Sequence, residues 1–273
     1  MRVARQPEEI DELSSDPLES ELDEDVGLAQ WKRFLIPVST VSPKPPKWII
    51  PNLLVPGLNI LAGPPKMFKS TLVLNMIAAI TECEPIRGSK GGMRAAKKGT
   101  AIYAAAEQSA GTLRRMYEER VRRKKMRPGV SWDFVVLKDP LRWQVDEHEH
   151  DYNWAELLRG MKPTIAVIDP WVSFHSQDEN DPRVIRPLIP LREEVLKYGG
   201  ALVIVHHTRK TQDNGKSAGN GPADEFGKIR GTSALWGMAD GGLMLRSLSS
   251  GAVNVSGTWK DYPSIDWTWR HDA

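Results

Sequence analysis

Fourteen residues, LNILAGPPKMFKST at positions 58–71, constrain the fold of this chain more than any other segment. An apolar, strand-like run ends at Gly63, a short turn-rich loop follows, and Lys69 opens a helix-like stretch that continues to Ile80. A strand, a tight loop and a helix N-terminus form an anion site, because free backbone N–H groups face the ligand and the helix dipole favours negative charge. The segment therefore predicts a nucleotide-phosphate site in an α/β fold.

The segment follows the P-loop pattern G-x-x-x-x-G-K-[ST] except at Phe68, where the pattern has its second glycine. Glycine there lets the backbone approach phosphate closely and take conformations that a bulky residue dislikes. In the predicted site Lys69 reaches the β- and γ-phosphates and the Ser70 hydroxyl binds Mg²⁺. The alternative is a strand-turn-helix with a chance Lys-Ser pair. The predicted nucleotide-binding residues are Gly63, Pro64, Pro65, Lys66, Met67, Phe68, Lys69, Ser70 and Thr71.

Two further strand-like runs end in a carboxylate. Residues 164–168 lead into Asp169, which fits the Walker B pattern, where an acid at a strand end holds Mg²⁺ beside the phosphates. Residues 101–106 lead into Glu107, which could polarise the attacking water as a general base. The alternatives are an ordinary strand end with a turn-favouring Asp-Pro and a solvated carboxylate near a helix start.

A fourth run, residues 201–205, ends in His206 and His207. Neighbouring side chains on a strand point to opposite faces, so at most one of these histidines faces the nucleotide. We interpret it as a sensor of the γ-phosphate, with a structural histidine as the alternative; adjacent residues are poor co-ligands for a metal. Farther on, Arg230 precedes a predicted helix and could reach a phosphate in the next subunit as an arginine finger, or pair within its own chain.

Charge is distributed unevenly along the 273 residues. The first 30 residues hold ten acidic and two basic side chains, a charge of −8, so the remainder carries +10 of the net +2. A basic body with an acidic tail suits a polyanion-binding protein, although the tail could serve solubility alone. Basic residues gather in a predicted helix around 114–127 and in a long loop, 208–228, which we interpret as a nucleic-acid surface; a solvated face and a plain connector are the alternatives.

The rest of the composition is typical of a globular protein of the cytoplasm. Hydrophobic residues make up 40% of the chain, and Cys83 is the only cysteine, so no intrachain disulfide forms. No apolar run approaches the length of a membrane span, and the N-terminus does not resemble a signal peptide. We therefore expect a cytoplasmic chain without a membrane partner.

Apolar runs alternate with helix-like segments after residue 57, which predicts a mostly parallel sheet covered on both faces, with an antiparallel C-terminal edge. We expect a disordered acidic tail over 1–30, a Pro- and Trp-rich connector over 31–50 and an ATPase domain over 51–273. The predicted strands are Leu58–Leu61, Ala101–Ala105, Phe134–Leu137, Ile165–Ile168, Ala201–Val205, Gly242–Leu245 and Val253–Gly257. The predicted helices are Ser70–Cys83, Gly111–Arg127, Asn153–Met161, Arg183–Lys197 and Thr232–Met238.

Taken together, the motifs resemble the RecA-like P-loop ATPase core of RepA-type plasmid and phage replicative helicases. The resemblance runs from about Trp48 to Leu245 and is carried by four ordered segments: WIIPNLLVPGLNILAGPPKMFKSTL, EQSAGTLRR, VIDPWVSFHSQDENDP, and VIVHHTRK with RGTSAL. The chain departs from the family pattern at Phe68 and at Gln108, where an Asp is commoner.

The resemblance implies a hexameric ring ATPase that uses ATP and Mg²⁺ and moves on single-stranded DNA as a replicative helicase. It implies that Lys69 and Ser70 bind phosphate and Mg²⁺, and that Asp169 is the Walker B acid. It assigns Glu107 as the catalytic base, His207 as the γ-phosphate sensor and Arg230 as an arginine finger acting on the neighbouring subunit. Two alternatives stay open: a RecA-like recombination or annealing ATPase without unwinding, and a non-hydrolysing nucleotide-binding adaptor, which Phe68 favours.

Overall fold

The structure is a computed structural model, which describes residues 34–41, 47–89, 92–121, 131–146, 153–208, 229 and 233–270. The chain divides into two compact units, Met1–Lys44 and Pro45–Ala273. In the first unit the described residues include a single 3₁₀ turn, η1 (Val38–Thr40), closed by a hydrogen bond from Thr40 Oγ1 to Pro37 O of 2.8 Å. The acidic tail predicted over 1–30 lies outside the described residues.

The second unit is built on one eight-stranded sheet with the strand order β3-β2-β4-β5-β1-β6-β7-β8. All pairings from β3 to β6 are parallel, whereas β7 runs antiparallel to both β6 and β8. This is the predicted α/β class, a mostly parallel sheet with an antiparallel C-terminal edge. The strands are β1 (Gly57–Gly63), β2 (Ala101–Ala105), β3 (Phe134–Val136), β4 (Ile165–Asp169), β5 (Ala201–His207), β6 (Gly241–Ser247), β7 (Val253–Trp259) and β8 (Ile265–Trp269).

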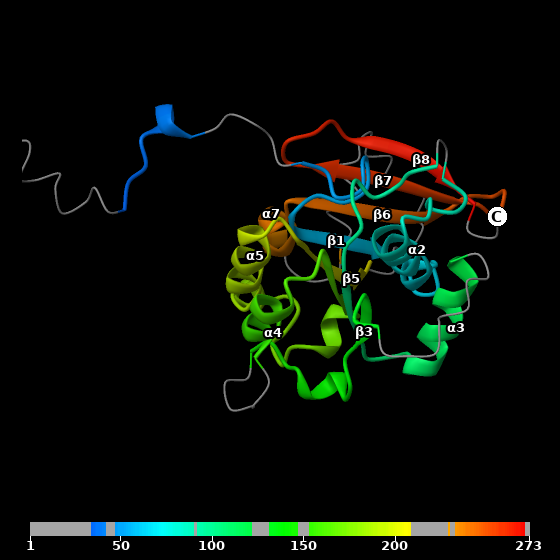
Figure 1. Cartoon of the computed structure of the whole chain (residues 1–273), viewed down its shortest axis with the longest axis horizontal. Helices are drawn as coiled ribbons and strands as arrows, with labels where there is room; N and C mark the ends of the chain where they lie inside the picture. The colour runs from blue at the N-terminus through cyan, green and yellow to red at the C-terminus, as the bar shows by residue number, and fades with distance from the viewer. Residues whose placement is uncertain are drawn as a thin grey trace, which may run out of the picture. The chain divides into compact units, whose positions relative to one another are not determined.

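Helices cover both faces of the parallel part of the sheet (Figure 1). On one face α2 contacts β1, β2 and β4 and packs against α3, while on the other face α5 contacts β1 and β5 and packs against α4. The helices are α2 (Lys69–Glu82), α3 (Ala110–Arg120), α4 (Trp154–Met161), α5 (Leu188–Lys197) and α7 (Ser233–Met238). Short 3₁₀ turns complete the unit: η2 (Pro140–Arg142), η3 (Trp171–Ser173) and η4 (Pro182–Ile185).

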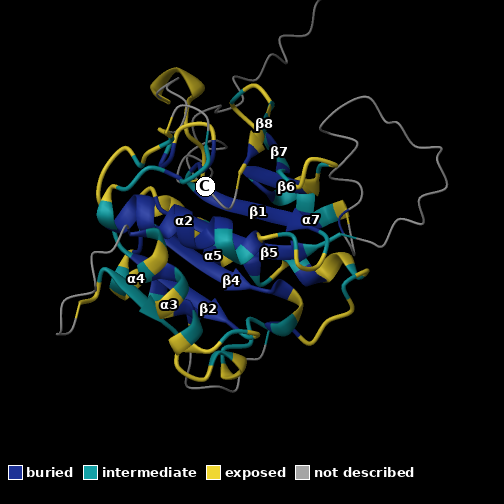
Figure 2. Ribbon diagram, turned by 90° about the vertical axis from the view of Figure 1, so that its right-hand side faces the viewer, coloured by how far each residue is buried: buried dark blue, intermediate teal, exposed yellow. Residues whose placement is uncertain are grey.

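The central strands are buried on both faces, as Figure 2 shows for β1, β4 and β5. Alternate side chains of each strand enter two separate apolar clusters, so Leu61, Val167 and Val203 lie with α2 and α3, whereas Ile60, Ile168 and Ile204 lie with α4 and α5. Burial on both faces explains the continuous apolar runs of these strands. In a half-exposed sheet, apolar and polar residues would alternate along each strand.

The predicted connector ends inside the second unit. Ile49 and Ile50 are buried in the cluster under α2. Trp48 packs against Trp259, with ring centroids 4.9 Å apart, and against Tyr262, at 4.3 Å. The last residues before the P-loop strand therefore belong to the core.

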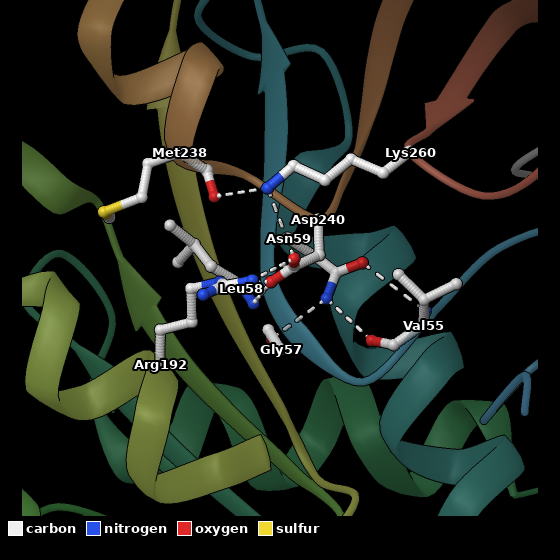
Figure 3. A network of polar contacts seen from close by, with 8 residues as sticks. All are labelled: Val55, Gly57, Leu58, Asn59, Arg192, Met238, Asp240 and Lys260. Atoms are coloured by element: carbon white, nitrogen blue, oxygen red, sulfur yellow. Dashed lines mark hydrogen bonds and ion pairs between the residues drawn. The ribbon is translucent and has the colours of Figure 1, made fainter. Parts of the chain in front are cut away.

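A polar network around Asp240 holds the amino end of β1 in place through hydrogen bonds and ion pairs (Figure 3). Asp240 Oδ2 accepts hydrogen bonds from Leu58 N at 2.9 Å and from Arg192 Nε at 2.6 Å, and Lys260 Nζ lies 3.4 Å from Asp240 Oδ1. Gly57 beside it has φ +94°, and a Cβ there would stand 2.2 Å from Asp240 Oδ2, so only glycine fits. The network joins β1, α5, β6 and the end of β7.

Several element boundaries differ from the predicted ones. The segment predicted as one helix over Arg183–Lys197 is η4 followed by α5, because Pro187 has no N–H with which to continue the helical hydrogen bonds. The described α3 ends at Arg120, short of the predicted Arg127, and residues 122–130 lie outside the described part. Strand β8 was not predicted. Among the described residues, no helix is long and apolar enough to cross a membrane.

Candidate nucleotide site

The P-loop connects the buried end of β1 to the first turn of α2. Lys69 is the first helical residue and Phe68 is its N-cap, and Leu72 N donates to Phe68 O at 2.9 Å. Phe68 has the left-handed conformation φ 53°, ψ 20°, so it adopts the backbone shape that a glycine gives at this position in the P-loop pattern. Its side chain is 39% exposed, which means that the ring stands at the surface beside the loop.

Gly63 stands where the loop leaves the sheet, and a side chain there would be crowded. A Cβ at Gly63 would lie 3.0 Å from Leu245 O on β6, tighter than nearly all real contacts. Of the predicted loop residues, Pro65 and Lys66 are exposed, while Pro64, Met67, Ser70 and Thr71 are half-buried. Lys66 also has a positive φ, of 62°, so two non-glycine residues of this loop take the left-handed region.

The Lys69 ammonium group is folded onto the loop and is buried. Its Nζ donates to Gly63 O at 2.9 Å and to Pro64 O at 2.8 Å, and lies 3.2 Å from His207 Nδ1. Burial lowers the pKa of Lys69 to about 8, against the raising effect of the Asp169 and Glu107 carboxylates. Lys69 is therefore held next to the end of β1 by groups that a phosphate ligand would replace.

Asp169 ends β4 and meets α2 through Ser70. The Ser70 hydroxyl donates to Asp169 Oδ2 at 2.8 Å, and the buried Tyr103 hydroxyl on β2 donates to the same oxygen. Burial raises the pKa of Asp169, while the hydrogen bonds from Tyr103 and Ser70 and the charge of Lys69 oppose that rise. The contact with Tyr103 was not predicted, since it joins residues 66 positions apart.

The Ser70 and Asp169 oxygens fit a magnesium ion. Mg²⁺ binds hydroxyl and carboxylate oxygens and is usually held by one or two protein groups together with waters and substrate phosphates. The two side chains stand together at the N-terminus of α2, next to Lys69. Among the described residues, no cluster of three or more His, Cys, Asp or Glu side chains suits a metal ion, so a closed, all-protein metal cage is not formed there.

Glu107 follows β2 at the same edge of the sheet. In the register of β2 and β4, Ala105 pairs with Asp169, and Ala106 N donates to Asp169 O at 2.9 Å. Glu107, the next residue, is exposed, and its charge acts on both Lys69 and Asp169. Glu107 therefore stands at the same edge of the sheet as Lys69 and Asp169.

The two histidines that end β5 point to opposite faces, as the strand period predicts. His207 is half-buried and contacts Lys69, whereas His206 is buried and its Nδ1 lies 3.0 Å from His207 O. Burial lowers the pKa of His206, which keeps this ring neutral at neutral pH. His207 is thus the histidine on the P-loop side.

The segment after β4 packs against the core. It begins with η3, and Trp171 and Phe174 are buried in the cluster under α4 and α5. Val145 N donates to Phe174 O at 2.9 Å, and Asp146 Oδ2 accepts from Ser176 N at 2.8 Å. Trp171 and Phe174, which follow Asp169 within a few residues, are the sequence signal for this packing.

Some predicted site residues lie outside the described part of the chain. These are Arg230, residues 209–228 of the long loop and the basic residues 122–127. Within the described part of the basic helix, Arg114 forms an ion pair with Glu118 at 2.9 Å, so this part of the helix surface is partly self-paired.

Comparison with known proteins agrees with this geometry. A family model described as AAA domain (AAA_25) matches residues 33–213, which is more than half of the chain and includes the P-loop, Glu107, Asp169 and His207. Comparison with curated proteins finds no match. The phosphate loop on β1, the acid that ends β4 and the family match lead to one assignment: the chain belongs to the AAA_25 family of AAA-type P-loop ATPases.

Proposed function

We propose that this P-loop ATPase couples ATP hydrolysis to movement on single-stranded DNA, as a replicative helicase that works as a hexameric ring. One observation carries the proposal: the ends of four adjacent parallel strands, β2, β4, β5 and β1, bring Glu107, Asp169, His207 and the P-loop to one edge of the sheet. Open α/β sheets bind ligands at this edge, outside the carboxyl ends of the strands.

The P-loop is the proposed phosphate site. Lys69 leaves the carbonyl groups of Gly63 and Pro64 and donates instead to the β- and γ-phosphate oxygens. The first N–H groups of α2 are directed at the same anion. Ser70 and Asp169 would hold Mg²⁺, which supplies charge neutralisation between the β- and γ-phosphates.

Glu107 and His207 are proposed to act on the γ-phosphate. Glu107 orients the attacking water and accepts its proton, because it is an exposed carboxylate after β2 whose charge acts on Lys69 and Asp169. His207 contacts Lys69 directly, so moving Lys69 onto phosphate changes the partner of the His207 ring. That exchange makes His207 a sensor of bound nucleotide.

The proposed partners are a second copy of this chain and single-stranded DNA. Arg230 would reach the nucleotide of the neighbouring subunit as an arginine finger. The positive charge of the chain after residue 30, +10, suits a phosphate backbone. The proposal therefore requires an oligomer in which the ATPase site is completed at a subunit boundary.

ATP hydrolysis measured with and without single-stranded DNA tests the proposal. We expect turnover that rises with DNA, and unwinding of a forked duplex. Turnover that rises with DNA, without unwinding, would replace the helicase by a recombination or annealing ATPase. Mixing wild-type chain with an Arg230→Ala variant should lower turnover more than dilution does, if the arginine acts across subunits.

Phe68 favours a second candidate, a nucleotide-holding adaptor that does not hydrolyse ATP. A bulky residue in the left-handed conformation stands where the P-loop pattern has glycine, beside the phosphate position. Absence of turnover with and without DNA, together with retained nucleotide binding, would support the adaptor and refute the motor.

A further inference from the structure

Tyr103 is a fully buried phenol at the centre of the nucleotide edge. It lies on β2, paired with Val167 of β4, and its ring packs in the apolar cluster under α2 and α3. A phenylalanine would fill the same space, so the hydroxyl needs its own explanation. A buried hydroxyl is costly unless it is hydrogen-bonded, and this one donates to the Asp169 carboxylate.

The Tyr103 and Ser70 hydroxyls converge on one oxygen of Asp169. Both donate to Oδ2, and none of the hydrogen bonds within the described residues ends on Oδ1. Two donors on one oxygen fix the rotation of a carboxylate about its χ2 bond and leave its other oxygen available. The Ser70 hydroxyl also serves the proposed cation, whereas Tyr103 bonds to the carboxylate from inside the core.

We infer that Tyr103 is a positioning residue of the Mg²⁺ site, which orients the Asp169 carboxylate from behind so that one oxygen faces the cation. The inference rests on the proposed function, since it presumes that Ser70 and Asp169 hold Mg²⁺ with the nucleotide. Residues behind a metal ligand typically change metal affinity by about 10- to 100-fold when their hydrogen bond is removed.

A Tyr103→Phe variant tests the inference through Mg²⁺-dependent nucleotide binding, with turnover left aside. A fluorescent ADP analogue is bound to the full chain, first with EDTA and then over a range of Mg²⁺ concentrations. Mg²⁺ should raise the affinity for the ADP analogue, and the midpoint of this rise gives the Mg²⁺ requirement. We expect this midpoint to lie at an about 10-fold higher Mg²⁺ concentration in the variant than in the wild type. Its affinity in EDTA should equal that of the wild type, because the P-loop itself is unchanged.

Tyr117→Phe is the matched control. Tyr117 is also a buried phenol in the cluster under α2, and its hydroxyl lies 2.6 Å from Thr81 Oγ1, away from Asp169. This variant should keep the wild-type Mg²⁺ requirement. Tyr103→Leu, which removes the hydroxyl with a different apolar shape, should show the Mg²⁺ shift if Tyr103→Phe does not fold.

Three outcomes would overturn the inference, and they are distinct. An unchanged Mg²⁺ requirement in the folded Tyr103 variants removes the positioning role. An equal loss of affinity with and without Mg²⁺ assigns Tyr103 to packing alone. Failure of the wild type to bind nucleotide, or to respond to Mg²⁺, refutes the proposed function itself, before any variant is compared.

Discussion

Replacing Asp240 by Asn should destabilise the strand that carries the P-loop. The Asp240 carboxylate accepts from Leu58 N on β1 and forms a two-pronged ion pair with Arg192 on α5. An asparagine can still accept from Leu58 N, but its NH₂ group then faces the Arg192 guanidinium, donor against donor. The change therefore removes the ion pair and the hydrogen bond from the Arg192 NH2 group, while the amide oxygen can still accept from Arg192 Nε.

The magnitude follows from the exposure of the pair. The side chains of Arg192 and Asp240 are 28% and 15% exposed, so the pair lies between a surface ion pair and a fully buried one. Hydrogen bonds to charged groups contribute about 1.5–3 kcal/mol and breaking a buried pair costs about 3–5 kcal/mol, so we expect a loss of about 2–3 kcal/mol. For a unit of this size the melting temperature should fall by roughly 4–12 °C.

Urea unfolding at neutral pH measures this loss, and Asp181→Asn is the matched control. Asp181 forms the same kind of pair with Arg183, at 2.6 Å, but at the surface, and Asn retains the cap that Asp181 provides to η4. The control should leave the unfolding midpoint unchanged. Equal midpoints for Asp240→Asn and the control would refute the reasoning, because the network would then contribute no more than a solvated pair.

Acidification gives a second check on the same residue. Burial alone would raise the pKa of Asp240, but the hydrogen bonds from Arg192 and Leu58 N outweigh it and lower that pKa. A group with a lowered native pKa stabilises the fold above its unfolded pKa, about 3.9 for Asp, and loses that contribution as the pH falls through the native value. The stability difference between wild type and Asp240→Asn should therefore shrink below about pH 4.

Three further predictions concern the nucleotide edge. Lys69→Ala should abolish Mg²⁺-ATP binding, measured by calorimetry, because it removes the cation that contacts Gly63 O, Pro64 O and His207; unchanged turnover would refute the phosphate site. Glu107→Gln should keep ATP affinity and lower turnover by about 100-fold or more, and normal turnover would remove Glu107 from its role. Phe68→Gly should relieve about 1–2 kcal/mol of left-handed backbone strain and tighten nucleotide binding. A lower affinity in a fluorescent nucleotide titration would contradict this prediction.

Much of the fold followed from local patterns in the sequence. The seven predicted strands all exist. Those at the centre of the sheet are buried on both faces, and their continuous apolar runs can be recognised in the local sequence. Strand β8 was missed, although Ile265–Trp269 alternates apolar and polar residues, a local pattern typical of a half-buried strand. The prediction of one long helix over Arg183–Lys197 was wrong. The apolar period of this segment is helical, but Pro187 interrupts the helix.

The candidate site was predictable to the extent that its residues end strands. Asp169, Glu107 and His207 lie at or next to the ends of apolar strands, and Lys69 and Ser70 begin the helix after the P-loop. Parallel strands place such ends at one edge of the sheet. The left-handed conformation of Phe68 was not predicted, because the sequence analysis treated Phe68 only as a departure from the P-loop pattern. The order of these motifs is a property of the sequence alone.

Tertiary structure decided which of these groups touch. Only the sheet order β2-β4-β5-β1 brings Tyr103 to Asp169 and His207 to Lys69, contacts that span 66 and 138 positions in the chain. The same holds for Arg192 and Asp240, whose pairing depends on how α5 crosses the amino end of β1. Local sequence fixes what each segment prefers to form, whereas contacts between distant segments depend on packing, which no single segment encodes.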